Sequence, residues 1–320
     1  MNKIDSIADC CEGGLESNSR AIPLKKKLPL LKTKFWQIFA SLLLVVFIVT
    51  QIFQVSIPHE ISTLAHQYHA NQIERELFPS NGVLLPLSWD GFGARLAYAG
   101  VIDPLKIEKL YERPGLNEFD HMMWYGSDPQ KITVSQNNSQ TILNAFWAFG
   151  LANENPVLSE GPMVNPAYGG VDRFASTGGW TLASTGIMDH YGQHKLVVLD
   201  DDEQALVEKV ARNIYRSCCD NSTYFPDCNH GMAMLGLLEM LAVNGATEEE
   251  MYKEALQMNV YWFPDTYRAI AQFMKERRGQ QWREVDPKVI LSQHFSSASG
   301  YQGVLAELNT RPAAGSSCSV

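Results

Sequence analysis

The sequence predicts a mainly α-helical protein with one N-terminal transmembrane helix, and three observations lead to this fold class. Residues 35–57 form an uncharged apolar run, helix-capping patterns recur after residue 200, and no alternating run is long enough to predict a strand. With 320 residues, 45% of them hydrophobic, the chain can bury a sizeable core. Its formal net charge of −9 argues against nucleic-acid binding, so we expect no nucleic-acid partner.

The apolar run at residues 35–57 predicts the membrane anchor. A helix of these 23 residues would be about 34 Å long, enough to cross a hydrocarbon core of about 30 Å. A cleavable signal peptide is the alternative, but the preceding 34 residues are long for its basic region and the apolar run exceeds the usual length. We therefore expect an uncleaved anchor whose partner is the lipid bilayer.

The charges on either side of the run predict its orientation. Residues 1–34 carry 7 Lys and Arg against 4 Asp and Glu, net +3, whereas the rest of the chain carries 19 against 31, net −12. Because basic flanks stay in the cytoplasm, the bulk of the chain is expected outside it, in the periplasm if the host is bacterial. A protein partner would then lie in the membrane or in the outer compartment.

The predicted organisation has four parts. Residues 1–34 form a basic cytoplasmic tail, residues 35–57 the transmembrane helix, residues 58–309 a mainly helical extracytoplasmic domain, and residues 310–320 a flexible tail rich in Ala, Gly and Ser. In the first half of the outer domain, the spacing of the apolar residues predicts helices or other buried segments over 59–78, 92–99, 104–111 and 140–151.

Residues 161–194 differ from the rest of the outer domain, since glycines and aromatic residues alternate there and predict a long irregular segment. After it, helices are expected at capping and proline signals, with Asp200–Asp202, Thr247 with Glu250, and Asp265 as caps. These helices cover, in order, 204–215, 231–243, 248–258, 266–278, 285–295 and 301–308.

A cysteine cluster is the strongest candidate for chemistry. Cys218, Cys219 and Cys228 fall within eleven residues, and His230 follows at the start of a predicted helix. A helix N-terminus stabilises a thiolate, which both thiol exchange and metal binding require. Three interpretations stay open: a structural disulfide from Cys228 to Cys218 or Cys219; a Zn or Cu site formed by the cysteines with His230; and a redox-active pair with these three cysteines as catalytic residues.

A second, weaker candidate metal site is the histidine pair His190 and His194. On a helix this i, i+4 spacing would place both imidazoles on one face, although Gly192 lies between them. The glycine-rich segment 161–194 around the pair gives an alternative function, a small-molecule-binding or hydrolytic domain. Another alternative is a non-enzymatic helical interaction protein whose cysteines form a structural disulfide.

Residues 216–260 resemble a known family. A Cys-rich turn is followed by an apolar helix, and the run from Gly245 to Tyr252 opens a second helix. This pattern is similar to the Cys-bearing helical hairpin of the membrane-tethered cytochrome c maturation thiol oxidoreductases, and it implies a thiol-redox role facing the periplasm. In that family two residues separate the cysteines, whereas Cys218 and Cys219 are adjacent, and Cys228 and His230 have no counterpart there.

Overall fold

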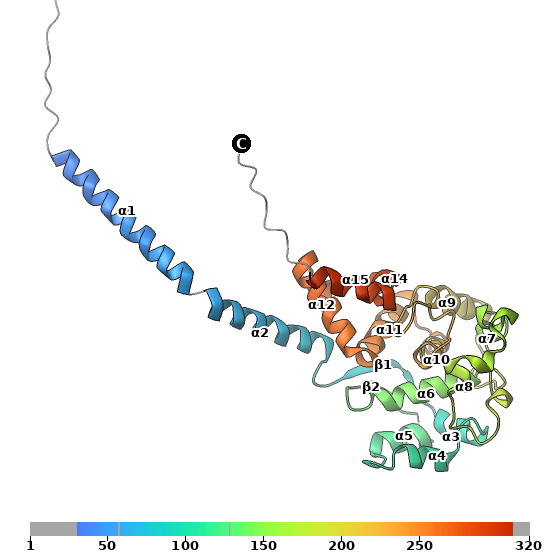
Figure 1. The fold of residues 1–320 in the computed structure, drawn as a ribbon. Helices are drawn as coiled ribbons and strands as arrows, with labels where there is room; N and C mark the ends of the chain where they lie inside the picture. Colours follow the sequence, from blue (N-terminus) through green and yellow to red (C-terminus); the bar gives the residue numbers. More distant parts are fainter. Residues whose placement is uncertain (1–30, 57, 128, 310–320) are drawn as a thin grey trace, which may run out of the picture. The chain divides into compact units, whose positions relative to one another are not determined.

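The computed structural model describes residues 31–56, 58–127 and 129–309, so most of the predicted cytoplasmic tail and the predicted flexible tail lie outside the described residues. The chain divides into two compact units, residues 1–64 and residues 65–320. The first contains α1 (Leu31–Ser56) and the start of α2 (Pro58–Leu77), and the second contains every other element (Figure 1).

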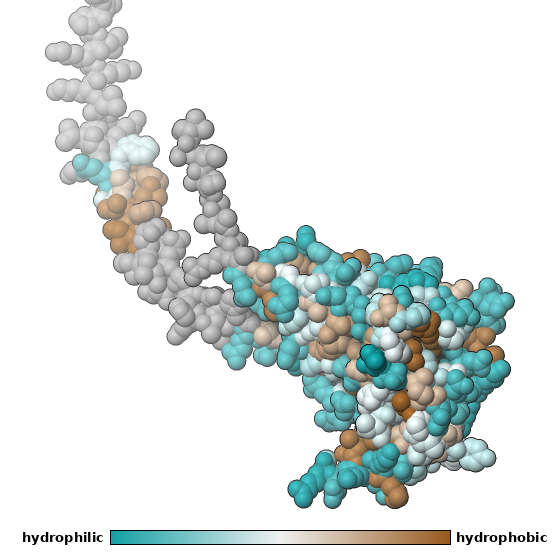
Figure 2. All heavy atoms as spheres, turned by 45° about the vertical axis from the view of Figure 1, so that its right-hand side comes forward, coloured by the Kyte–Doolittle hydropathy of each residue, from teal (hydrophilic) through white to brown (hydrophobic). Residues whose placement is uncertain are grey.

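Helix α1 covers residues 35–56 of the predicted apolar segment as one continuous helix, and residue 57 lies outside the described residues. Its large apolar side chains between Phe35 and Val49 are exposed, and they form a brown stretch on α1 in Figure 2. Across the described residues, none of the helices combines the length and the apolar character that a bilayer crossing needs.

The second unit is mainly helical, which confirms the helical part of the predicted fold class. Its longest helices are α6, α10, α11 and α12, and the short helices α13 and α14 lead into α15. Beyond α2, the helices are α3 (Phe92–Tyr98), α4 (Pro104–Leu110), α5 (Glu118–Tyr125), α6 (Ser139–Ala152), α7 (Pro156–Ser159), α8 (Ala175–Gly178), α9 (Asp201–Ala211), α10 (Asn229–Val243), α11 (Glu248–Trp262), α12 (Pro264–Arg278), α13 (Pro287–Ile290), α14 (Gln293–Ser296) and α15 (Ala298–Asn309).

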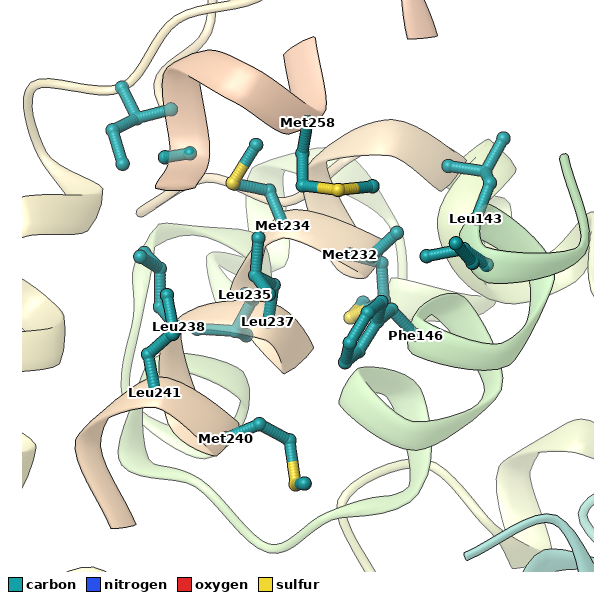
Figure 3. Close-up of a cluster of buried hydrophobic side chains, with 14 of the residues drawn as sticks. Leu143, Phe146, Met232, Met234, Leu235, Leu237, Leu238, Met240, Leu241 and Met258 are labelled. Carbon is teal, nitrogen blue, oxygen red and sulfur yellow. The ribbon is translucent and has the colours of Figure 1, made fainter. Parts of the chain in front are cut away.

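Helices α6 and α10 pack closely at the centre of the core. Gly150 and Gly236 allow this approach, because a Cβ on Gly150 would lie 2.8 Å from the Gly236 nitrogen. Met and Leu side chains of α10 surround this contact together with Phe146 of α6 and Met258 of α11 (Figure 3). Since almost every side chain of α10 is buried, this helix holds its N-terminus in a fixed place within the unit.

Two strands were not predicted. Strand β1 (Val83–Ser88) pairs antiparallel with β2 (Lys131–Val134). Leu85 and Leu87 of β1 are buried, but the exposed positions between and before them are occupied by Leu84 and Pro86, which hide the alternation in the sequence. In β2 the alternation is clean but lasts only four residues.

Three predicted helix boundaries were wrong. Helix α9 ends at Ala211 rather than at Tyr215. The Tyr215 N–H donates its hydrogen bond to Leu291 O at 2.8 Å instead of to a carbonyl within the helix. Asp265 does not cap α12, since Pro264 fixes the first turn and Phe263 holds the cap position. The helix predicted over 285–295 is instead the two short helices α13 and α14.

The glycine-rich segment is irregular, as predicted. It contains α8 and short 3-10 turns, and its backbone is hydrogen-bonded to the rest of the unit near its middle and at its C-terminal end. Ser176 N–H donates to Asp227 O at 3.0 Å, and His194 N–H donates to Ala152 O at 2.9 Å. The turns are Pro162–Val164, Pro166–Tyr168, Val171–Arg173 and Ile187–Asp189.

Candidate functional site

The three cysteines meet in the loop that joins α9 to α10. The loop folds back on itself through an antiparallel bridge between Tyr215 and Ser222. Its tip is held to the start of α15, where Ala298 N–H donates to Cys219 O at 2.9 Å. These backbone contacts bring Cys218 next to Cys228 although ten residues separate them in the sequence.

Cys228 is the N-cap of α10. Its Sγ accepts the Gly231 N–H at 3.4 Å and therefore satisfies one of the free N–H groups at the helix start. The Sγ of Cys218 lies 3.4 Å from the Sγ of Cys228, too far for a covalent bond, and all three cysteines are free thiols. Cys218 is exposed, while Cys219 and Cys228 are half-buried.

A buried arginine completes the site. The side chain of Arg216 is only 1% exposed, and its Nε donates to Cys228 Sγ at 3.0 Å. Its remaining nitrogens donate to Asp227 Oδ1 at 2.8 Å and to the carbonyls of Asn221 and Phe225 at 3.0 and 3.1 Å. The guanidinium thus places a fixed positive charge beside the Sγ of Cys228, and the carboxylate of Asp227 neutralises that charge.

These neighbours favour the thiolate of Cys228 over that of Cys218. Hydrogen bonds from the Cys218 and Cys219 thiols, with smaller contributions from His230 and Arg216, lower the pKa of Cys228 despite its burial. The same hydrogen bonds to Cys219 and Cys228 raise the pKa of the Cys218 thiol. The pair therefore divides into a stabilised thiolate at the helix start and an exposed thiol in the loop.

His230 lies on the first turn of α10, beside Cys228. Its ring packs against Phe263 with centroids 4.4 Å apart, and its Nδ1 is buried without a hydrogen-bond partner among the described residues. The ligand atoms of Cys218, Cys228 and His230 all lie within 4.8 Å of one another. The predicted convergence of cysteine and histidine at a helix start is thus present in the fold.

Cys219 faces a different neighbour. Its Sγ lies 3.9 Å from Asp227 Oδ1, and with Asp227 and Cys228 it forms a second group of possible ligands that does not include His230. The four residues predicted as one metal set therefore form two overlapping groups that share Cys228.

The histidine pair of the glycine-rich segment is a separate feature. His190 Nδ1 and His194 Nε2 lie 3.0 Å apart, and Thr185 Oγ1 is 2.9 Å from the other ring nitrogen of His190. The rings meet through a turn rather than on a helix, and burial lowers the pKa of both. Within the described part of the chain, neither histidine belongs to a group of three potential ligands.

Sequence reasoning missed two residues of the site, Arg216 and Asp227. Both lie close to the cysteines in the sequence, but Arg216 meets Cys228 and Asp227 only through the fold of the loop, which no local spacing in the sequence indicates. The glycine-rich segment also reaches the site, because Phe174 packs against Phe225 of the cysteine loop with ring centroids 5.4 Å apart. Its α8 therefore supports the loop without bringing the histidine pair to it.

Comparisons of the chain with family models, with curated proteins and with solved structures found no match.

Proposed function

We propose that this protein is a membrane-tethered thiol–disulfide exchange protein that acts outside the cytoplasm, with Cys218 and Cys228 as the reactive pair. One observation carries the proposal: the Sγ of Cys228 accepts hydrogen bonds from the buried Arg216 and from the start of α10, while the Sγ of the exposed Cys218 lies 3.4 Å away. A stabilised thiolate beside an accessible second sulfur is the arrangement that thiol exchange requires.

The geometry favours the oxidising direction of exchange. A substrate thiolate attacks the exposed sulfur of a Cys218–Cys228 disulfide, and Cys228 leaves as the thiolate that Arg216 stabilises. The second substrate thiolate then attacks the mixed disulfide and releases Cys218 as a thiol. The substrate loses two electrons and two protons, and the protein gains them. Stabilising the Cys228 thiolate lowers the free energy of the reduced form and therefore raises the reduction potential, and a thiol of low pKa also leaves faster.

The apolar segment supports the membrane tether. In α1 the side chains from Phe35 to Val49 are apolar and exposed, and the N-terminal flank is basic. Apolar side chains with no protein covering are favoured in lipid, and the positive flank favours an N-terminus in the cytoplasm. A reporter enzyme fused after Val320 is expected to be active only outside the cytoplasm, and activity inside it would contradict the proposed compartment.

The exchange reaction is tested with reduced full-length protein and oxidised glutathione. In protein whose Cys10, Cys11 and Cys318 are replaced by Ser, we expect two molecules of reduced glutathione to be released and peptide mapping to find the Cys218–Cys228 disulfide. In Cys228→Ser the resolving thiolate is missing, so glutathione should stay attached to Cys218 as a mixed disulfide.

The vicinal cysteine provides the matched control. Cys219→Ser keeps Cys218, Cys228 and Arg216 in place and should form the same disulfide as the unmodified protein. A disulfide that uses Cys219 instead, or a Cys228→Ser variant that binds no glutathione at Cys218, would contradict the proposed reactive pair.

A further inference from the structure

We propose that the reduced form of the same cysteine pair binds a zinc ion through Cys218, Cys228 and His230. The proposal rests on the proposed function only because it uses the same two sulfurs. It adds a metal-bound state of the reduced site to the exchange reaction. Thiolate sulfur and imidazole nitrogen are the ligands that Zn²⁺ prefers in proteins.

The distances fit one shared cation. Two sulfurs that bind the same Zn²⁺ at about 2.3 Å in a tetrahedral arrangement lie about 3.8 Å apart. The Sγ atoms of Cys218 and Cys228 are 3.4 Å apart, and the ligand atom of His230 lies within 4.8 Å of both. To close around an ion, the sulfurs would separate by about 0.4 Å and the ligand atom of His230 would come to about 3.5 Å from each sulfur, a movement of at most about 1.3 Å.

His230 carries the second, independent observation. Its Nδ1 is a buried polar atom with no hydrogen-bond partner among the described residues, although a buried nitrogen of this kind is normally satisfied. Phe263 and Trp262 hold the ring from the side, with centroids 4.4 and 6.1 Å from that of His230. The imidazole is thus held beside the sulfurs, and its Nδ1 makes no hydrogen bond within the described residues.

The charges of the surroundings also suit a dication. Two thiolates neutralise Zn²⁺, while Arg216 and Asp227 neutralise each other at 2.8 Å, so the closed site carries no net charge. Arg216 Nε already donates to Cys228 Sγ at 3.0 Å, as outer hydrogen bonds to metal-bound thiolates do.

Cys219 is not assigned as a ligand. Its Sγ belongs to a second group, with Asp227 and Cys228, that does not include His230. The three-ligand site leaves a fourth coordination position for water or for a substrate thiolate. This assignment makes Cys219→Ser an internal control for the metal site.

The test is metal binding by the reduced, full-length protein in detergent, with Zn²⁺ and with Co²⁺ as its spectroscopic substitute. We expect one ion per chain, a thiolate-to-cobalt charge-transfer band and the visible bands of tetrahedral Co²⁺. Bound Zn²⁺ should also protect Cys218 and Cys228 from alkylation while Cys219 stays reactive.

Variants then assign the ligands. Cys218→Ser and His230→Asn should each weaken Zn²⁺ binding by at least about tenfold, whereas Cys219→Ser and His121→Asn, which replaces an exposed histidine elsewhere, should bind as the unmodified protein does. Cys218 is exposed, so its replacement tests the site even if His230→Asn fails to fold.

The result that would overturn the proposal is the absence of a thiolate charge-transfer band, or unchanged binding in both Cys218→Ser and His230→Asn. Such a result would leave the exchange reaction intact if glutathione still produces the Cys218–Cys228 disulfide in metal-free protein. Conversely, metal binding without that disulfide would support the zinc site and contradict the proposed exchange function.

Discussion

Replacing Gly231 by Ala should displace the arginine that stabilises Cys228. A Cβ at Gly231 would meet the Arg216 Cζ at 2.6 Å and its Nε at 2.9 Å, so the guanidinium must move. This movement breaks two hydrogen bonds of Arg216, the one from Nε to Cys228 Sγ and the one to Asp227 Oδ1.

The magnitude follows from the contacts that are lost. Two hydrogen bonds to charged groups contribute roughly 3–6 kcal/mol, and Ala in place of Gly within a helix returns about 1 kcal/mol. We therefore expect Gly231→Ala to lower the free energy of unfolding by roughly 2–5 kcal/mol. Urea denaturation of the full-length protein, followed by tryptophan fluorescence, measures it. The thiol of Cys228 should also react more slowly with alkylating reagents near neutral pH, because less of it is thiolate.

Gly303→Ala is the matched control, since Gly303 lies in α15 and a Cβ there would meet nothing within 4 Å. This variant should be as stable as the unmodified protein or more stable, by up to about 1 kcal/mol. Equal stability of Gly231→Ala and Gly303→Ala, together with unchanged reactivity of Cys228, would refute the placement of Arg216 over the helix start.

Two further predictions concern the core that positions the site. Glu239 is fully buried in α10, and burial raises its pKa well above the usual range although Asn153 donates to it at 3.0 Å. The folded protein therefore keeps a proton that the unfolded chain releases, so stability should fall by about 1.4 kcal/mol per pH unit as pH rises above about 4.3 toward the folded pKa. Glu239→Gln should flatten this slope in urea titrations between pH 5 and pH 7, and parallel profiles for the two proteins would count against it. Gly150→Ala should destabilise the protein by roughly 1–3 kcal/mol, because its Cβ would lie 2.8 Å from the Gly236 nitrogen; a melting temperature equal to that of the unmodified protein would show that α6 and α10 are farther apart.

The elements that the sequence predicts well have local causes. Thr247 and Glu250 form the capping box of α11, and Asp200 caps α9, as predicted. Each cap depends only on residues three positions apart, so the sequence alone indicates it. The two strands escaped prediction for the opposite reason. In β1 the apolar Leu84 and Pro86 occupy exposed positions, which only tertiary contacts decide, and β2 alternates cleanly but over only four residues.

In the candidate site, too, the features with local causes were predicted and those that depend on tertiary contacts were not. The sequence places Cys228 and His230 at a helix start, and that position is confirmed. The role of Arg216 could not be predicted, since its partners Cys228 and Asp227 come within reach only when the loop closes. His190 and His194 do meet, but through a turn and as a hydrogen-bonded pair, which their i, i+4 spacing alone does not predict.

The most direct test of the proposed function is the reduction potential of the Cys218–Cys228 pair, measured in the full-length, metal-free protein against glutathione buffers. We predict a value more positive than about −220 mV, since structural disulfides have potentials below about −300 mV and thiol oxidants lie well above them. Arg216→Lys should lower the potential by roughly 30–60 mV, the equivalent of one hydrogen bond to a charged group. A potential more negative than about −220 mV, or an Arg216→Lys variant with an unchanged potential, would contradict the proposed oxidising role, and a value below about −300 mV would leave the cysteines with a structural role.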